Sequence, residues 1–145
     1  MFKSILVPTD GSPLSDKAIE AAIDFAKASG IKIVALSVAE PYPFSPLYEG
    51  AMTAESGIYE AKMEELAQGH VQKIAAAAKL LNVPCETVVA QSFSPYEEII
   101  KAAQQFGCDV IFMASHGRKG LNRLFLGSET QKVLAHTTLP VMVFR

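Results

Sequence analysis

The chain has little net charge, no long hydrophobic run and few cysteines. With 13 basic and 15 acidic residues its formal charge is -2, so it lacks the broad basic surface that non-specific nucleic-acid binding requires. Its longest apolar stretches, such as Val110 to Ala114, have the length of a strand, far below the roughly 18 residues of a membrane-spanning helix. We therefore expect neither nucleic acid nor a membrane as a partner.

Only two cysteines are present, Cys85 and Cys108. Neither belongs to a CxxC pair or has a histidine nearby in the sequence, so no zinc site or redox motif is predicted. We interpret both as small buried hydrophobic residues. The first ten residues contain Lys3 but not the apolar segment of about 7 to 15 residues found in secretory leaders, and we expect a cytoplasmic protein.

Hydrophobic residues make up half of the 145-residue chain and charged residues 19%, a composition typical of one compact domain over residues 1–145. Runs rich in valine and isoleucine alternate with segments of helical periodicity. That alternation predicts a doubly wound α/β fold around a mainly parallel sheet. The expected strands are Ile5 to Thr9, Lys32 to Val38, Cys85 to Ala90, Val110 to Ala114 and Val141 to Phe144.

Four helices are expected to flank this sheet. The first has an apolar face made of Ala18, Ala21, Ala22, Phe25 and Ala26, and it stops at Gly30. The second runs from Met63 to Leu81 for roughly six turns and ends before Pro84. The third and fourth begin with capping-box spacings, Ser94 with Glu97 and Ser128 with Gln131, so the fourth starts at Ser128.

The segment from Ala39 to Gly57 has three prolines and no clean periodicity. It predicts a long excursion after the second strand. The excursion is either a lid over a binding site or a flexible connection without a role in binding.

Two polar, turn-prone segments follow the first and fourth predicted strands. The first reads P-T-D-G-S from Pro8, and the second reads A-S-H-G from Ala114. Ligands of open α/β sheets bind beyond the carboxyl ends of the strands, where the chain leaves neighbouring strands in opposite directions. We therefore expect a binding site at these two strand ends.

The segment from Ala114 to Ser128 has the layout of a phosphate-binding loop, with A-S-H-G, nine residues, G-S and then a helix. Gly117 and Gly127 allow backbone N–H groups to approach an anion closely. The start of the fourth helix adds unpaired N–H groups and the positive end of a dipole. Negative charge is favoured there.

Several side chains near this loop could strengthen phosphate binding. Ser128 and Thr130 offer hydroxyl donors. Arg118, Lys119 and Arg123 either contact phosphate or form a solvated loop surface. His116 is either a donor to phosphate or a turn residue with its ring in solvent.

Asp10 either holds a ribose hydroxyl or Mg²⁺, or it caps the first turn of the first helix. No spacing links a nucleophile to a base held by a third group, so no catalytic residue is assigned. His70 and His136 lie within helical patterns, far from the loop in sequence. We interpret both as structural.

Taken together, the segments ILVPTDGS, MASHGRKGLNRLFLGS and LPVMVFR make the chain resemble the universal stress proteins over essentially its whole length. The long second motif with its fixed spacing is far more specific than a short glycine pattern. The resemblance implies five parallel strands in the order 3-2-1-4-5. It also implies a homodimer that forms through the last strand, Pro140 to Arg145.

One branch of that family binds ATP through G-x2-G-x9-G-S/T, and this chain has A-x2-G-x9-G-S. The resemblance implies that adenine and ribose contact Pro8, Thr9, Asp10 and Val38. It implies a phosphate site that includes Met113, Ala114, Ser115, His116, Gly117, Arg118, Gly127, Ser128, Glu129 and Thr130. If residue 114 requires a positive φ, Ala114 weakens binding about five- to thirtyfold, whereas at negative φ its methyl group fits.

Three functions are compatible with these residues. The first is a regulatory stress-response module that binds ATP, AMP or ADP, with or without Mg²⁺, and changes what a dimer presents to a protein client. The second is a slow ATPase or nucleotidyl-transfer enzyme, motivated by the loop and by Asp10. The third is a nucleotide-free interaction protein, motivated by Ala114 and by the excursion at 39–57.

Overall fold

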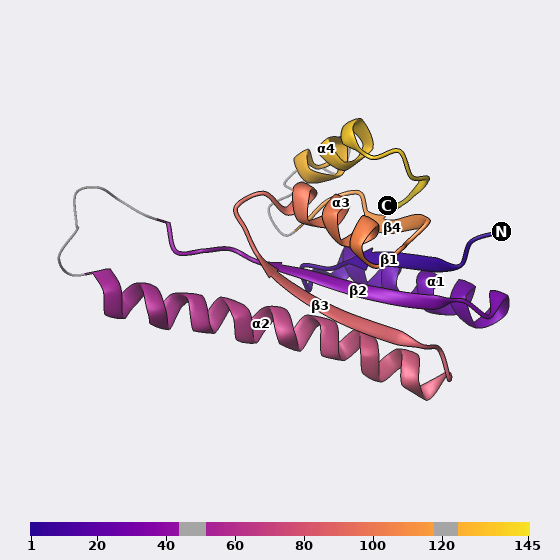
Figure 1. Cartoon of the computed structure of the whole chain (residues 1–145), viewed down its shortest axis with the longest axis horizontal. Helices are drawn as coiled ribbons and strands as arrows, with labels where there is room; N and C mark the ends of the chain where they lie inside the picture. Colours follow the sequence, from indigo (N-terminus) through magenta and orange to yellow (C-terminus); the bar gives the residue numbers. More distant parts are fainter. Residues whose placement is uncertain (44–51, 118–124) are drawn as a thin grey trace.

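Five parallel strands form the centre of the computed structural model (Figure 1), in the order β3-β2-β1-β4-β5. The structure describes residues 1–43, 52–117 and 125–145, with side chains from residue 55 onward in the second range. The strands are β1 (Ser4–Pro8), β2 (Lys32–Ala39), β3 (Cys85–Gln91), β4 (Val110–Ala114) and β5 (Val141–Phe144). The predicted strand order is confirmed, and the predicted boundaries agree within one residue at each end.

Helices cover both faces of the sheet, as the doubly wound α/β prediction requires. The helices are α1 (Pro13–Ser29), α2 (Met52–Leu80), α3 (Pro95–Gln105) and α4 (Ser128–His136). Residues of α1 and α2 share one core with Ile5 and Val7, whereas residues of α3 and α4 share the other with Leu6. Because side chains alternate along β1, its neighbouring residues enter different cores, and all three are fully buried.

Helix α1 begins and ends with the residues that such ends favour. Ser12 is the N-cap and its side chain accepts a hydrogen bond from Ser15 N, and Pro13 follows at the first helical position. Gly30 ends the helix at φ 67°, as predicted, because glycine adopts the left-handed conformation without steric cost. These residues place the start of α1 directly after the end of β1.

The predicted apolar face of α1 is partly wrong. Ala18, Ala22 and Ala26 are buried, but Ile19 and Ile23 complete the face, and Phe25 is 37% exposed. The Phe25 ring instead lies at the margin of the core, 5.7 Å from the ring centroid of Phe112. The α1 face is therefore rotated from the predicted one toward the two isoleucines.

Helix α2 begins at Met52, well before the predicted start at Met63, so the excursion predicted over 39–57 is partly helix. Its buried stripe consists of Ala67, Val71, Ile74 and Ala78. The turns before this stripe extend past the end of the sheet in Figure 1, where Ile58 is 73% exposed. In these turns Tyr59 packs against Tyr42 at a ring-centroid distance of 5.3 Å. The turns carry no apolar periodicity, so the pattern could not indicate them.

The capping box predicted at α3 is not formed. The Ser94 side chain makes no capping hydrogen bond, and Glu97 accepts from the Tyr96 hydroxyl instead. A carboxylate from α4 takes the place of the expected cap, because Tyr96 N donates to Glu129 Oε2 at 2.9 Å. A tertiary contact thus replaces the local one.

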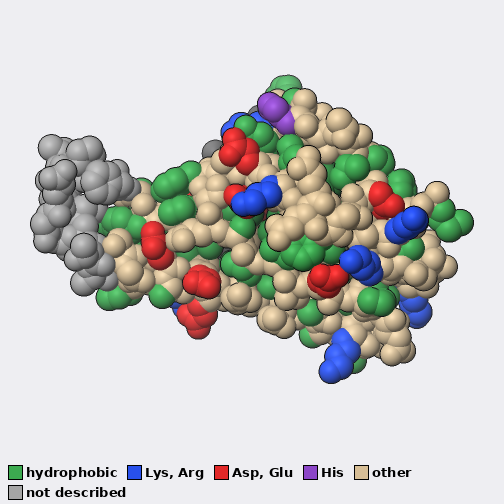
Figure 2. All heavy atoms as spheres, viewed as in Figure 1, with side chains coloured by type: hydrophobic (Ala, Val, Ile, Leu, Met, Phe, Trp, Pro, Cys, Tyr) green, Lys and Arg blue, Asp and Glu red, His purple; other side chains and the backbone are tan. Residues whose placement is uncertain are grey.

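The surface in Figure 2 carries acidic and basic side chains interspersed, and neither sign forms a continuous patch on this face. Exposed ion pairs contribute to the mixture, among them Lys32 with Glu86 at 2.8 Å. Within residues 1–43, 52–117 and 125–145, no helix has the length and apolar character needed to cross a membrane.

Candidate functional site

The ends of β1 and β4 lie side by side at one edge of the sheet. The two strands pair through Ile5 with Val110 and Leu6 with Ile111. Beyond the strand ends, Asp10 and Gly117 are in close contact, because a Cβ atom added at Gly117 would lie 2.8 Å from Asp10 Oδ2. The structure therefore brings together the two polar segments that the sequence singled out.

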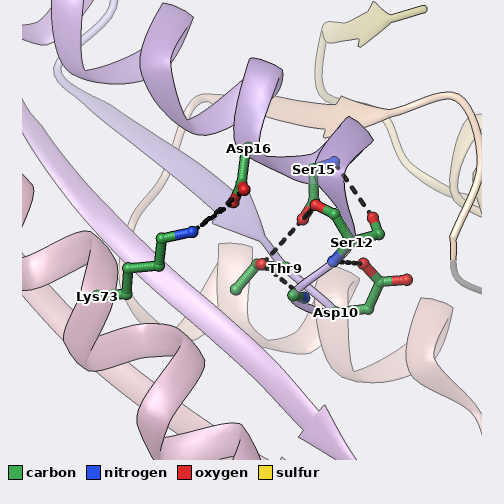
Figure 3. Close-up of polar contacts among 7 residues, drawn as sticks. Thr9, Asp10, Ser12, Ser15, Asp16 and Lys73 are labelled. Carbon is green, nitrogen blue, oxygen red and sulfur yellow. Dashed lines mark hydrogen bonds and ion pairs between the residues drawn. The ribbon is translucent and has the colours of Figure 1, made fainter.

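A closed set of hydrogen bonds shapes residues 9–15, which we call the β1 turn (Figure 3). Gly11 N donates to Thr9 Oγ1 at 3.1 Å, and Ser12 N donates to Asp10 Oδ1 at 3.0 Å. Ser15 N donates to Ser12 Oγ at 3.2 Å, and the Ser15 and Thr9 hydroxyls are 3.1 Å apart. Of the two roles weighed for Asp10, the capping role at α1 belongs to Ser12, and Asp10 shapes the turn before it.

His70 of α2 lies directly behind the β1 turn. A Cβ atom added at Gly11 would lie 2.3 Å from His70 Nε2, and His70 Nδ1 is 3.5 Å from Ser37 Oγ. Ser37 in turn donates to the carbonyl of Thr9 at 2.9 Å. The distance in sequence between His70 and the loops concealed this proximity.

A signal for His70 was present in the sequence. The residue follows Ala67 by three positions and precedes Ile74 by four, so it belongs to the buried stripe of α2. A polar side chain within such a stripe has to face another polar group. Here that group is Ser37, and His70 is the residue near the site that the sequence interpretation missed.

The end of β4 and the start of α4 are joined by short contacts across Gly127. Gly127 N donates to Ser115 O at 2.7 Å. A Cβ atom added at Gly127 would lie 3.1 Å from Ser115 O and 3.2 Å from His116 Cα, both backbone atoms. Only glycine fits this approach without a shift of the neighbouring backbone, so Gly127 sets how near the start of α4 comes to β4.

The N-terminus of α4 has no side-chain cap among the described residues. Gly127 is the N-cap at φ -61° and ψ 154°, and α4 starts at Ser128 as predicted. The predicted capping box of Ser128 and Gln131 is wrong, because Gln131 Nε2 donates to Leu126 O at 2.6 Å. Gln131 faces back along the chain, and the first N–H groups of α4 receive no acceptor from it.

Ala114 stands where the ATP-binding motif has its first glycine, and its backbone is unstrained. The residue is the last of β4, and Asn82 is the single non-glycine residue with positive φ in the described ranges. The alternative in which Ala114 is penalised by a positive φ is therefore wrong. The residue is 9% exposed.

Ser115 and His116 follow β4 and make hydrogen-bond contacts with each other. The Ser115 hydroxyl lies 2.8 Å from His116 Nδ1, and Ser115 is 1% exposed. His116 Nε2 is buried and has no hydrogen-bond partner within the described part of the chain. The ring is thus held by Ser115 and is not the solvent-facing turn residue of the second alternative. Arg118, Lys119 and Arg123 lie outside the described residues.

Two residues in the first turn of α4 direct their side chains away from the proposed phosphate position. Thr130 Oγ1 donates to Ala114 O at 2.9 Å, so its hydroxyl hydrogen is already used within the protein. Glu129 points toward α3. Ser128 is exposed, and among the side chains of this turn its hydroxyl is the one that is turned to solvent.

Of the residues expected around the base and ribose, Val38 packs half-buried against the core on the α3 and α4 side of the sheet. Met113, expected in the phosphate site, is buried in the same core. Pro8, at the end of β1, pairs in register with Leu36 of β2. An apolar surface thus adjoins the polar strand ends.

The titratable groups of the described residues give little support for redox or metal chemistry. Burial raises the pKa of both cysteine thiols, Cys85 and Cys108, which disfavours the reactive thiolate. Cys108 is buried as expected, but Cys85 is only half-buried. Over the described ranges, no three residues of the His, Cys, Asp or Glu type cluster closely enough to hold a metal.

Comparison with known proteins finds relatives that match this chain over essentially its whole length. The universal stress protein YxiE of Bacillus subtilis is 33% identical over 151 residues that cover all of both chains. The structure of hypothetical protein MJ0577 of Methanocaldococcus jannaschii matches with a TM-score of 0.83 and 26% identity, over 99% of this chain and 96% of that one.

Two ligand-bound universal stress proteins share the fold. One is in complex with cAMP (TM-score 0.72, 20% identity, 99% and 97% of the two chains), and one from Archaeoglobus fulgidus is in complex with dAMP (TM-score 0.66, 16% identity, 99% and 98%). The family model for the universal stress proteins matches residues 1–145. The strand order, the paired strand ends and these matches agree, and the chain belongs to the universal stress protein family.

Proposed function

We propose that this protein is a regulatory module that binds ATP or a related adenine nucleotide at the carboxyl ends of β1 and β4. In this proposal the base and ribose lie against Pro8, Thr9, Asp10 and Val38. The phosphates lie at Gly117 and at residues 127–130, where the loop over 114–128 meets α4. The observation that carries the proposal is the uncapped start of α4, which Gly127 brings within contact of the β4 end.

The first N–H groups of α4, which no side chain of the described residues caps, favour an anion. The N-terminus of one helix stabilises an anion by only about 0.3–1 kcal/mol, or up to ~2 when partly buried, so several donors have to combine. The Gly127 contact holds the start of α4 against the backbone of Ser115 and His116, and His116 Nε2 has no hydrogen-bond partner within the described residues. The structures bound to cAMP and dAMP support an adenine nucleotide as the ligand, because their fold is the same.

A Mg²⁺ ion bound together with the phosphates would find one carboxylate here. Asp10 Oδ1 accepts from Ser12 N, and Oδ2 is directed at Gly117. Mg²⁺ is commonly held by one or two carboxylates with the remaining ligands from phosphate and water. Asp10 fits that role only with a nucleotide present, and we propose it as the residue that would hold the ion.

We further propose that the protein acts as a cytoplasmic homodimer whose nucleotide state is read by a protein client. Strand β5 is the edge of the sheet, pairs on one side with β4 and exposes Met142 to 46%. An edge strand of this kind can pair with a second copy. Sedimentation equilibrium at micromolar concentration tests this part, and a monomer would contradict it.

Titration calorimetry of ligand-free protein with ATP, AMP and adenosine in magnesium buffer tests the binding proposal. We expect saturable ATP binding that Gly127→Val abolishes, because the larger side chain meets the backbone of Ser115 and His116. Gly69→Val is the matched control, because nothing lies within 4 Å of a Cβ added there. No binding up to millimolar ATP in the unmodified protein would overturn the proposal, and ATP loss over long incubation would indicate turnover.

A further inference from the structure

Glu129 lies in the first turn of α4, yet its carboxylate serves α3. Oε2 accepts a hydrogen bond from Tyr96 N at 2.9 Å, between residues 33 positions apart in sequence. Tyr96 is the second residue of α3, where a helix has N–H groups without an intrahelical acceptor. Ser94, the N-cap of α3, does not supply one from its side chain.

The surrounding side chains hold this contact in place. Lys132, one turn further along α4, pairs with Glu129 Oε1 at 3.2 Å. Its Nζ lies 5.6 Å from the centroid of the Tyr96 ring, and the His136 ring lies 5.1 Å from the same ring. One face of α4 therefore contacts both the backbone and the ring of Tyr96. The Glu129 carboxylate binds its N–H group, and the side chains of Lys132 and His136 lie near its ring.

The other side of the same turn is fixed to β4. Thr130 Oγ1 donates to Ala114 O at 2.9 Å and lies 3.3 Å from Ser115 O. Neighbouring residues of one turn thus hold it from two directions, Glu129 toward α3 and Thr130 toward the sheet. Gly127 N closes the arrangement with its bond to Ser115 O.

The direction of the Glu129 carboxylate also matters electrostatically. A carboxylate free to fold over the start of α4 would occupy the positive end of the helix dipole and repel an anion there. Bound to Tyr96 N, it lies instead at the start of α3, with Lys132 close to its other oxygen. The N–H groups of α4 then remain accessible to a ligand.

We propose that Glu129 is a positioning residue for the phosphate site: by accepting from Tyr96 N it fixes the start of α4 and keeps its own charge away from the phosphates. The inference rests on the proposed nucleotide function. It also specifies that the effect concerns the phosphates and not the base, because the contact lies at the α4 end of the site and does not involve Pro8 or Val38.

Titration calorimetry with ATP and with adenosine tests this role. We expect Glu129→Ala to weaken ATP binding about five- to tenfold, the effect of losing one typical hydrogen bond, and to leave adenosine binding within about twofold. Glu129→Gln keeps a carbonyl acceptor for Tyr96 N and should recover most of the ATP affinity. Glu98→Ala is the matched control, because Glu98 belongs to α3 and pairs with Lys101 at 3.7 Å.

An amide readout separates positioning from general loss of stability. In ¹H–¹⁵N spectra of the unmodified protein, the Tyr96 amide should shift on saturation with ATP and stay unchanged with adenosine. Equal ATP affinity in Glu129→Ala and the unmodified protein would overturn the inference, as would equal losses for ATP and adenosine, or a Glu129→Gln variant as weak as Glu129→Ala. Absence of ATP binding by the unmodified protein would instead show that the proposed function itself has failed.

Discussion

Two helices begin at the same edge of the sheet and differ in how their first N–H groups are treated. At α1, the side chains of Thr9, Asp10 and Ser12 accept the N–H groups of the β1 turn and of the helix start. At α4, Gly127 has no side chain to offer and Gln131 turns back to Leu126. The protein satisfies its own donors at α1, whereas at α4 no side chain of the described residues provides a cap.

The difference indicates which of the two helix starts is structural and which is open to phosphate. A helix start whose N–H groups are bound by side chains contributes to the stability of the fold. The β1 turn in Figure 3 is of this kind. A helix start that a glycine holds close to the sheet, and that no side chain caps, has N–H groups that can bind an anion. Substitutions at the first should therefore reduce stability, and substitutions at the second should reduce binding.

The largest effect is expected at Gly11, on the filled side. Gly11 has φ 74°, and a Cβ atom there would lie 2.3 Å from His70 Nε2. Gly11→Ala should lower the free energy of unfolding by about 2–4 kcal/mol, from backbone strain together with overpacking. Urea denaturation measures the loss. In the Gly11→Ala/His70→Ala double variant the overpacking part should disappear and the backbone part remain, and a Gly11→Ala variant of unchanged stability would contradict the comparison.

A side-chain cap on α4, like the one on α1, should block phosphate binding at the start of α4. In Gly127→Asp a carboxylate would reach the first N–H groups of α4 and compete with phosphate, so ATP affinity should fall about ten- to a hundredfold. Calorimetry measures the change, and Gly127→Ala shows how much of it comes from crowding against Ser115 O alone. Retention of ATP affinity in Gly127→Asp would mean that phosphate does not bind at the start of α4.

The two serines near the helix starts offer a matched pair. Ser12 Oγ accepts from Ser15 N, so Ser12→Ala should cost about 1 kcal/mol of stability and leave ATP binding unchanged. Ser128 is exposed and caps nothing, so Ser128→Ala should stay within about ±0.5 kcal/mol. Thermal unfolding of both variants side by side makes the measurement. Equal losses at the two serines would remove the distinction between the helix starts.

The smallest effect is expected at the ion pair that joins α1 to α2. Lys73 Nζ lies 3.1 Å from Asp16 Oδ2, and the two side chains are 69% and 37% exposed. Such a pair contributes little because solvent screens it, so Lys73→Ala should lower stability by less than about 0.5 kcal/mol and the loss should shrink in high salt. Lys62→Ala, which removes an exposed pair within α2, is the control. A larger loss of stability would mean that this ion pair helps to fix the start of α1, next to the β1 turn, against α2.

The centre of the sheet could be predicted from sequence because β1, β2 and β4 are largely buried on both faces and consist mostly of hydrophobic residues. Ile5, Leu6 and Val7 are each fully buried, and such runs have few alternative structures. The start of α2 could not be predicted, because its first turns extend past the end of the sheet and carry no apolar stripe. Apolar periodicity arises where a helix buries one face, so it does not indicate helical turns that bury no apolar face.

The capping box predicted at α3 failed because local spacing does not reveal tertiary competitors. Ser94 and Glu97 have the spacing of a capping box, yet Glu129 reaches Tyr96 N from another helix. The positions of Asp10, Gly117 and Gly127 were predictable, since the strand order alone brings the ends of β1 and β4 together. The spacing of His70 to Ala67 and Ile74 indicated that it faces the sheet, but its contact with the β1 turn was not predictable, because the register of α2 on the sheet depends on packing that no single segment encodes.

Ala114 shows how a sequence motif can be stricter than the physics behind it. The residue ends a β-strand in ordinary extended backbone and its methyl group is nearly buried, so the fold requires a small side chain there but not glycine. A classification that demands glycine at this position would separate this chain from relatives with the same backbone path. Gly127, whose absent side chain the neighbouring backbone does require, is the more reliable marker for finding other family members with this loop.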